Sequence, residues 1–488
     1  MNFIHTQPAD RYQRQFGLLT RFGLQSNVIR VASYTNVEAE GAVLSKAVVY
    51  PALRKVVQEY PELGMISFYG QSKKKKAQHR SFSGILSHIN LDDHVEFLEI
   101  PTEEGKAGLT TTIERYHGVW FDSSKKPPWR LVVVNGKHAI FVFDHFITDG
   151  RGSTFIFESL LEALNSPNQC HNGSSIIELT TEVKGFPEVD PVKRYGTGPS
   201  ILFAIMSYIR FWCIQFFYRG TDLFFNDARY QQRDLAFGEP KKEDNLVVTK
   251  IDTLCLEADT MSKCLQACRE HQTSFTSLLH TLIKVSLSAD FYPKAKFSHS
   301  VTGIDVRPYL LNQDRDKTIS TAVSIISSFD WLHTFHQAGQ STGSIDPVPV
   351  NSDLLWELAR KHRAHVVNDL NHKRSWMKAW LSIDLIGDDE EEYISQLLPG
   401  LKIVQKNSFA VSNLGAFDNR SARPWIISNM EFSAGAVKAG YGPNLVFNVA
   451  GVRDAATVIH VSSEEGSLSN DFVALLLGSI EKRILAVI

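Results

Sequence analysis

The chain has 488 residues and a nearly balanced charge, with 51 lysines and arginines against 53 aspartates and glutamates. Such a surface creates no large positive field, so the composition does not favour nucleic acid or an acidic partner. The length exceeds that of one ordinary core. We therefore predict two domains, residues 1–184 and 245–488, joined by a crossover linker at 185–244.

The cysteines and the known metal and nucleotide motifs narrow the classes of function further. Five cysteines, an odd number, include no Cys-x-x-Cys pair, and no H-E-x-x-H, Walker loop or dinucleotide fingerprint occurs. This argues against a disulfide framework, a metal site and nucleotide hydrolysis. The N-terminus lacks the basic head and apolar run of a secretory signal. We expect no metal, no permanently bound cofactor and a cytoplasmic location.

Strand-like runs alternate with helical ones through the first half. The apolar spacing predicts strands at 27–33 and 64–69, with a helix at 38–60 between them. Residues 130–134 and 139–144 predict a β-hairpin, because Asn135-Gly136 between them is a strong signal for a tight turn. Its second strand leads directly into a histidine.

That histidine opens the most informative segment, F-V-F-D-H-F-I-T-D-G-R-G, at residues 141–152. His145 follows an apolar run, and Asp149 stands four residues later. Gly150 and Gly152 let the backbone turn sharply before an amphipathic helix at 153–164. Histidine titrates nearest neutrality, so it can take a proton from an alcohol or thiol. The pattern predicts a strand, a catalytic turn and a helix.

The bare pattern H-x-x-x-D occurs three times, so context has to choose among the matches. The match at 88–92 has no strand before it and no glycine turn after it. The match at 365–369 is expected on a helix, where an i,i+4 pair usually means a surface contact. His145 is therefore the favoured candidate. The alternative is a histidine whose only role is in the core.

The linker contains an unusual apolar stretch from Ile201 to Tyr218. Arg210 and Gln215 would be costly at the middle of a membrane, so a transmembrane span is disfavoured. Two interpretations stay open. The segment is a helix buried against the domains, or a helix on a membrane or lipid surface, with residues 198–226 making contact at the endoplasmic reticulum or a lipid droplet.

The second half begins with a predicted strand at 245–256 and two predicted helices at 259–271 and 273–289. The second of these helices carries a broad apolar face. A further strand at 297–306 ends at Arg307-Pro308. The second half is thus also expected to be a sheet flanked by helices.

Four motifs occur in an order that resembles fungal alcohol O-acetyltransferases. They are P-P-W-R-L-V-V-V at 127–134, the His145 segment, V-T-G-I-D-V-R-P-Y-L at 301–310 and F-A-V-S-N-L-G at 409–415. The similarity runs from about Tyr12 to the C-terminus. It extends to the CoA-dependent acyltransferase superfamily of chloramphenicol acetyltransferase, plant BAHD enzymes and condensation domains. The D-F-G-W-G motif of plant BAHD enzymes is absent, which favours the fungal branch.

The resemblance implies an α/β (α+β) fold with two chloramphenicol-acetyltransferase-like subdomains. Each would be a mixed sheet flanked by helices, with an active-site tunnel between them. It also implies an acyl-CoA-dependent O-acyltransferase. Acetyl-CoA would be the co-substrate and a small alcohol, terpenoid or other secondary metabolite the acceptor. His145 would act as general base in a ternary complex, and we expect a monomer.

The resemblance also implies roles for other residues. Asp149 would pair with Arg307 and hold the His145 turn rather than take part in a catalytic dyad. Ser412, Asn413 and Gly415 would lie near the thioester, as oxyanion donors or CoA contacts. The alternative for these three residues is a simple turn.

Two other functions remain open at this stage. A condensation-type enzyme would share the His145 turn but would use a carrier-protein thioester, and the chain shows no carrier domain or attachment serine. A non-catalytic binding protein on the same fold would keep the tunnel and lack turnover. The intact H-F-I-T-D-G sequence argues against this last possibility.

Overall fold

The computed structural model describes most of the chain. The described residues are 2–70, 80–101, 103, 105–166, 174–179, 202, 205, 206, 209, 212, 213, 216, 217, 220–230, 247–311, 318–340, 350–373, 376, 390, 407–419, 423–439 and 441–488. Most of the predicted linker at 185–244, including Arg210, therefore lies outside the described part.

Five strands form the first sheet, in the order β14, β2, β8, β7 and β6. The sheet is mixed, because β6 and β7 are parallel while the other pairs are antiparallel. The strands are β2 (Val28–Asn36), β6 (Val95–Leu98), β7 (Trp129–Val134), β8 (His138–Phe143) and β14 (Trp425–Ala434).

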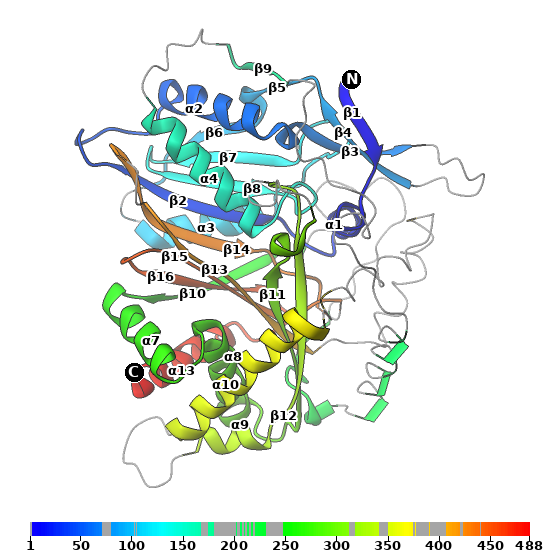
Figure 1. The fold of residues 1–488 in the computed structure, drawn as a ribbon, viewed down its shortest axis with the longest axis vertical. Coiled ribbons are helices and arrows are strands. Elements are labelled where there is room, and N and C mark those ends of the chain that lie inside the picture. Colours follow the sequence, from blue (N-terminus) through cyan, green and yellow to red (C-terminus); the bar gives the residue numbers. More distant parts are fainter. Residues whose placement is uncertain are drawn as a thin grey trace.

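Helices cover both faces of this first sheet (Figure 1). Helices α2 (Lys46–Glu59) and α4 (Gly150–Asn165) pack on one face, and α3 (Gly105–His117) packs on the other. Alternate residues of a strand point to opposite faces. On β2, accordingly, Val28 belongs to the core under α2 and α4, whereas Ile29 belongs to the core under α3.

Strand β14 links the two halves of the chain. It lies far beyond residue 245 in the sequence, yet it pairs antiparallel with β2 in the first sheet. The predicted division into residues 1–184 and 245–488 does not anticipate this exchange, because no local pattern distinguishes a strand that pairs with a distant sheet. The boundaries of that division stay a prediction.

Six strands form the second sheet, in the order β10, β16, β15, β13, β11 and β12. It is also mixed, because β13 is parallel to both β11 and β15. The strands are β10 (Thr249–Leu256), β11 (Phe297–Asp305), β12 (Val323–Trp331), β13 (Ser408–Phe417), β15 (Leu445–Val452) and β16 (Thr457–Glu464).

A helical layer packs on the second sheet and completes its core (Figure 1). Its helices are α7 (Ala258–Glu270), α8 (Phe275–Ser286), α9 (His333–Ala338), α10 (Ser352–Asn368) and α13 (Phe472–Val487). Single turns are found at η4 (Gly220–Asp222), η5 (Leu287–Phe291), η6 (Arg307–Tyr309) and η7 (Asp369–Lys373).

Smaller elements lie beside the first sheet. Helix α1 (Arg11–Arg21) lies beside a three-stranded sheet in the order β1, β4 and β3. A second, short sheet consists of β5 and β9. Their bounds are β1 (Phe3–Pro8), β3 (Met65–Gly70), β4 (Arg80–Leu86), β5 (His88–Asn90) and β9 (Ile176–Glu178), with turns η1 (Pro61–Gly64) and η2 (Leu91–Asp93).

The predicted hairpin is confirmed and one predicted helix is too long. Asn135 and Gly136 join β7 to β8 with φ of 50° and 58°, as a tight hairpin turn requires. The helix predicted at 38–60 begins only at Lys46. The Asn36 side chain accepts hydrogen bonds from the backbone of Glu38 and Ala39, so this stretch forms a turn instead of a helix.

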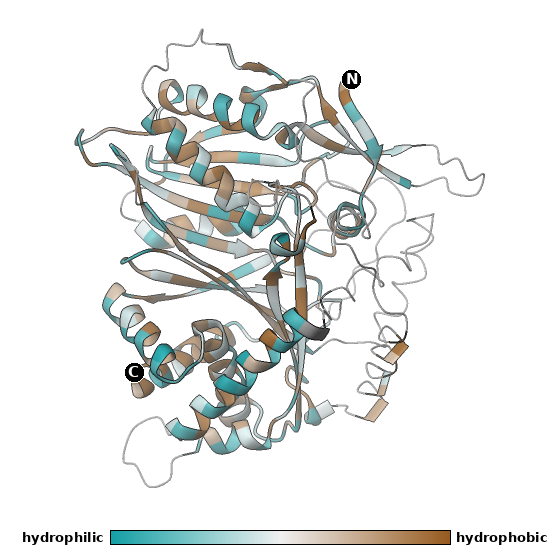
Figure 2. Ribbon diagram, in the orientation of Figure 1, coloured by the Kyte–Doolittle hydropathy of each residue, from teal (hydrophilic) through white to brown (hydrophobic). Residues whose placement is uncertain are grey.

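The apolar linker segment is helical at the eight positions that the structure describes between 202 and 217. All eight are exposed, and the seven large apolar side chains among them are 42% to 70% accessible. The interpretation as a buried helix is therefore wrong for these side chains. The short helical pieces of this segment lie at the lower right of Figure 1, and brown in Figure 2 marks their hydrophobic residues. No described helix is long and apolar enough to cross a membrane.

Candidate active site

The catalytic turn connects β8 to α4, and two aspartates shape it. Asp144 accepts a hydrogen bond from the backbone N–H of Phe146 at 2.8 Å and closes the turn after the strand. Asp149 caps α4 by accepting from the N–H of Gly152 at 2.8 Å. Because of this cap the helix begins at Gly150, three residues earlier than predicted. The predicted order of strand, turn and helix is present.

His145 is partly exposed, and its ring lies flat against an aromatic side chain. The Phe16 ring stacks on the imidazole with 3.8 Å between centroids and 6° between planes. The Asp149 carboxylate and the backbone carbonyls of His145 itself and of Thr148 also act on the ring. Burial lowers the pKa of His145, and these groups offset the effect of burial only in part. The shift favours the neutral imidazole.

Asp149 is buried, and its carboxylate binds three donors. Besides Gly152 N, it accepts from Ala322 N at 2.7 Å and pairs with Arg307 Nη2 at 3.1 Å. Burial alone would raise the pKa of Asp149, but Arg307 and the two N–H groups outweigh it and hold the pKa below its ordinary value. The three donors fix the start of α4 and do not include the His145 ring, as expected for a structural aspartate.

Arg307 connects the turn to the second half of the chain. Its guanidinium donates to Asp305 Oδ1 at 3.0 Å, to the carbonyl of Thr318 at 3.0 Å and to that of Ser320 at 2.8 Å. Burial would lower the pKa of Arg307, but Asp149 and Asp305 outweigh it, so the pKa is raised. The predicted Asp149–Arg307 pair is present in the structure.

Residues 318–322, here called the docking segment, lie directly on the catalytic turn. Thr148 Oγ1 donates to the Ile319 carbonyl at 2.6 Å, and Thr321 Oγ1 donates to the His145 carbonyl at 2.9 Å. The backbone of His145 is thus held from the second half of the chain. The sequence does not predict these contacts, because threonines in a strand-like run carry no signal of a distant partner.

Gly150 and Gly152 are required for a different reason from the one predicted. We expected a sharp backbone turn, but neither residue has a positive φ. A Cβ on Gly152 would lie 2.1 Å from Thr148 Oγ1 and 2.6 Å from the Ile319 carbonyl. A Cβ on Gly150 would lie 2.7 Å from the Leu414 side chain. The lack of a side chain at Gly152 leaves room for the docking segment, and the lack of one at Gly150 leaves room for Leu414.

The S-N-L-G motif lies beside the turn through this Leu414 contact. Asn413 Nδ2 donates to Thr276 Oγ1 at 3.0 Å, and Asn413 Oδ1 accepts from Gly415 N at 2.8 Å. Gly415 has a φ of 74°, at an irregularity where β13 and β15 shift register. Ser412 is partly exposed. The motif is more than a simple turn, because it holds the end of β13 against the start of α4.

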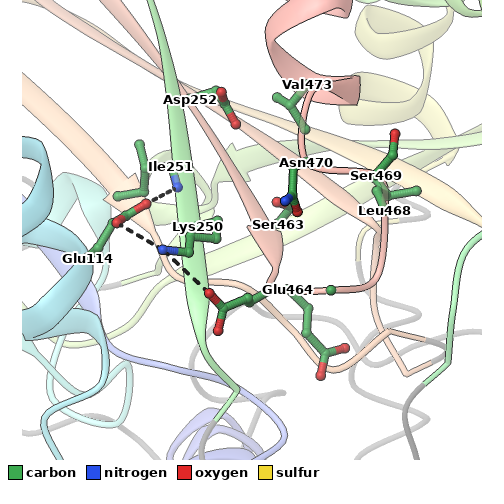
Figure 3. A pocket seen from close by; sticks show the side chains of 12 residues that line it. Glu114, Lys250, Ile251, Asp252, Ser463, Glu464, Leu468, Ser469, Asn470 and Val473 are labelled. Carbon is green, nitrogen blue, oxygen red and sulfur yellow. Dashed lines mark hydrogen bonds and ion pairs between the residues drawn. The ribbon is translucent and has the colours of Figure 1, made fainter.

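A separate pocket of about 410 Å³ lies where α3 meets β10 and the end of β16 (Figure 3). Lys250 there lies 3.5 Å from both Glu114 and Glu465, and Glu114 also accepts from Ile251 N at 2.8 Å. No residue of the catalytic turn lines this pocket. The ion pair of Lys250 with Glu114 joins the two halves of the chain. This pocket is separate from the site of His145.

Comparisons with known proteins show the family of the chain. The family model of alcohol acetyltransferases matches residues 15–477. A protein of Fusarium pseudograminearum described as a probable alcohol acetyltransferase, FCK4, is 22% identical over 429 residues, which cover 82% of this chain and 79% of that protein. The N-acetyltransferase SLI1 of Saccharomyces cerevisiae is 21% identical over 252 residues, which cover 49% of this chain and 52% of SLI1.

Solved structures share the fold at low sequence identity. The TRI3 trichothecene 15-O-acetyltransferase of Fusarium sporotrichioides superposes with a TM-score of 0.69 at 13% identity, over 99% of this chain and 95% of TRI3. The condensation domain of the Monacolin K polyketide synthase MokA gives 0.60 at 10% identity, over 99% of this chain and 98% of that domain. The predicted fold of mixed sheets flanked by helices is confirmed.

Proposed function

The chain belongs to the alcohol acetyltransferase family and is an O-acetyltransferase, and we propose that it transfers acetyl from acetyl-CoA to an alcohol with His145 as general base. The observation that carries the proposal is the geometry of the turn. A partly exposed, neutral imidazole follows a strand, and its backbone is fixed by Thr321 and by the Asp149–Arg307 pair. A neutral imidazole can accept the proton of a hydroxyl.

The proposed reaction is a direct transfer in a ternary complex. His145 takes the hydroxyl proton as the alcohol oxygen attacks the thioester carbonyl. The tetrahedral intermediate then collapses, its C–S bond breaks, and the imidazolium returns the proton to the CoA thiolate. Holding both substrates in one tunnel makes their reaction nearly unimolecular. The enzyme keeps no cofactor between turnovers.

Ser412, Asn413 and Gly415 are the proposed oxyanion or CoA contacts. The tetrahedral intermediate needs hydrogen-bond donors where its negative charge forms. The Asn413 amide gives one N–H to Thr276, and the proposal assigns its second N–H to the substrate. Ser412 supplies a hydroxyl at a partly exposed position of the same strand. Leu414 places this segment against the N-terminus of α4, which also attracts negative charge.

The proposed acceptor is a hydroxylated small molecule, either a short alcohol or a larger secondary metabolite such as a terpenoid. TRI3, which shares the fold, acts on a trichothecene. SLI1 is an N-acetyltransferase, so an amine is the second candidate acceptor for this chain. Both acceptors would require the same proton removal by His145.

The test is thiol release from acetyl-CoA by the purified chain, with primary, secondary and terpenoid alcohols and with primary amines. We expect release that depends on an added alcohol and is lost in His145→Ala. Release with amines alone would replace the hydroxyl acceptor by an amine. Turnover only with an acetylated carrier protein would favour the condensation-type alternative, and binding of alcohols without release would favour a non-catalytic protein.

We further propose that the exposed apolar face of the 202–217 segment contacts a lipid surface, such as that of the endoplasmic reticulum or a lipid droplet. The eight described positions recur every three or four residues, so they share one face of a helix. That face includes Trp212, Phe216 and Phe217 and no charged residue among the described positions. Such a face suits the interface of a lipid layer.

Flotation with phosphatidylcholine vesicles, with and without phosphatidylserine, tests this contact. The double variant Phe216→Ser/Phe217→Ser should lose flotation. Leu475→Ser is the control, because Leu475 is an exposed leucine of α13, at 62% accessibility, outside the 202–217 segment. If the unaltered chain does not float, or if the double variant instead abolishes a dimer in solution, the lipid contact is wrong.

A further inference from the structure

Helix α1 is anchored firmly at its N-terminus. Asp10 and Gln13 form a capping box, in which each side chain accepts a hydrogen bond from the other residue's backbone N–H. Gln13 also accepts from Ser83 at 3.0 Å, and Arg14 pairs with the buried Glu390 at 2.9 Å. These contacts fix the helix relative to the sheet of β3 and β4.

The apolar face of α1 packs on the same elements that hold Arg307. Leu18 and Leu19 are buried in a cluster with Val306, Ala322 and Ile326. Val306 precedes Arg307, and Ala322 donates to Asp149. Any displacement of α1 would therefore reach the residues that support the catalytic turn.

A second face of α1 lies directly on the catalytic turn. Phe16 stacks on His145, and Thr20 hydrogen-bonds the side chain of Asp144. Gly17 between them faces Phe146, whose ring would be 3.7 Å from a Cβ at that position. Residues four apart share one face of a helix. One helix face thus covers three consecutive residues, 144–146, including the proposed base.

We propose that Phe16 is a positioning residue for His145, fixing the plane of its imidazole so that one nitrogen is directed at the acceptor hydroxyl. This inference rests on the proposed function of His145. The backbone of His145 is already held by Thr321, but a backbone contact does not fix rotation about the side-chain bonds. The backbone carbonyls of His145 and Thr148 act on the imidazole from its edge, and the phenyl ring of Phe16, stacked on it at 3.8 Å with 6° between the planes, fixes the plane of the imidazole.

The charged groups around His145 stay in place when Phe16 is replaced, so a change in the pKa of His145 reports the loss of the phenyl ring. Asp149 caps α4, Asp144 precedes the histidine, and Arg21 of α1 acts on Asp144. Arg307 neutralises Asp149. Removal of the phenyl ring would admit water to the imidazole while leaving these charges in place. Since burial is the main cause of the lowered pKa, the pKa of His145 should rise towards its ordinary value.

The experiment compares Phe16→Ala with Phe16→Tyr and with Ile113→Ala. Tyrosine keeps a flat ring over His145. Ile113→Ala removes buried apolar volume from α3, on the other face of the first sheet, without touching the turn. We expect kcat of Phe16→Ala to fall roughly 10- to 100-fold, as for a misplaced catalytic group. The acid limb of its pH profile should move to higher pH, Phe16→Tyr should restore both properties, and Ile113→Ala should lose stability alone.

Two results would overturn the proposal. Phe16→Ala could lose stability as Ile113→Ala does while keeping its kcat and pH profile, which would make Phe16 a core residue only. Phe16→Tyr could fail to restore either property although the variant is folded.

A measurement without substrate separates this proposal from the proposed function. The ¹³C-labelled histidine ring of His145, identified by its absence in His145→Ala, is titrated by NMR in the unaltered chain and in Phe16→Ala. An upward shift of its pKa supports the contact even if no alcohol is acetylated. An unchanged pKa contradicts the positioning role even if the enzyme is active.

Discussion

Replacing Arg307 by methionine, which has a similar length and no charge, tests the support of the catalytic turn. The change removes hydrogen bonds to Asp149, Asp305, Thr318 and Ser320. At pH 7 the Asp149 carboxylate, 2% exposed, would keep only the N–H groups of Gly152 and Ala322. A buried charge that loses its partner costs about 3–5 kcal/mol of folding free energy.

The loss of stability in Arg307→Met depends on pH through the pKa of Asp149. In the unaltered chain the folded-state pKa of Asp149 is below its ordinary value. Its contribution to stability is therefore present above an unfolded pKa of about 3.9 and lost as the pH falls through the folded pKa. Without Arg307, burial raises the pKa of Asp149. The destabilisation should then be largest at neutral pH and should decrease as the pH falls towards that raised value.

Urea unfolding at pH 7 and pH 5 measures both effects. In Arg307→Met/Asp149→Asn the unpaired charge is gone, so this double variant should be more stable than Arg307→Met, by about 1–3 kcal/mol. A double variant no more stable than Arg307→Met would refute the buried pair. An Arg307→Met variant that unfolds like the unaltered chain, yet loses as much activity as His145→Ala, would give Arg307 a direct catalytic role.

Three further outcomes follow from the same turn. Gly152→Ala should destabilise the protein more than Gly150→Ala, because its Cβ would meet the Ile319 backbone rather than a movable leucine side chain, and comparison of urea midpoints checks this. Thr321→Val should lower kcat with little change in stability, whereas Thr321→Ser should retain it, since only the hydroxyl reaches the His145 carbonyl. Because burial lowers the pKa of His145, the acid limb of kcat/KM should fall below pH 6.5, and a midpoint above that value in the unaltered chain would contradict the neutral imidazole.

The parts of the site that lie within one local pattern could be predicted from the sequence. The hairpin was predictable because Asn135-Gly136 specifies a tight turn, and it delivers the chain to His145. The family resemblance predicts the Asp149–Arg307 pair, and spacing does not. The two residues are 158 positions apart in the sequence and meet only in the folded chain. The sequence indicates Gly150 and Gly152 for backbone freedom, whereas the structure shows the close approach of Leu414 to Gly150 and of Thr148 to Gly152.

Long-range contacts with weak local signals could not be predicted. Thr321 and Ala322 look like ordinary strand residues, and only the fold brings them onto the turn. The sequence pattern indicates only that Phe16 is one apolar residue of an amphipathic helix, although its ring stacks on His145, the proposed base. The exchange of β14 into the first sheet is of the same kind, since pairing across about 400 residues leaves no local trace.

Comparison of His145→Ala with His88→Ala tests the central claim most directly. Both positions carry the H-x-x-x-D pattern, but His88 is an exposed residue of β5, away from the catalytic turn. With acetyl-CoA and the best alcohol, kcat/KM should fall on the order of 10²- to 10⁴-fold in His145→Ala, the range for a lost general base. His88→Ala should match the unaltered chain. A folded His145→Ala variant that keeps full alcohol-dependent thiol release would contradict the account.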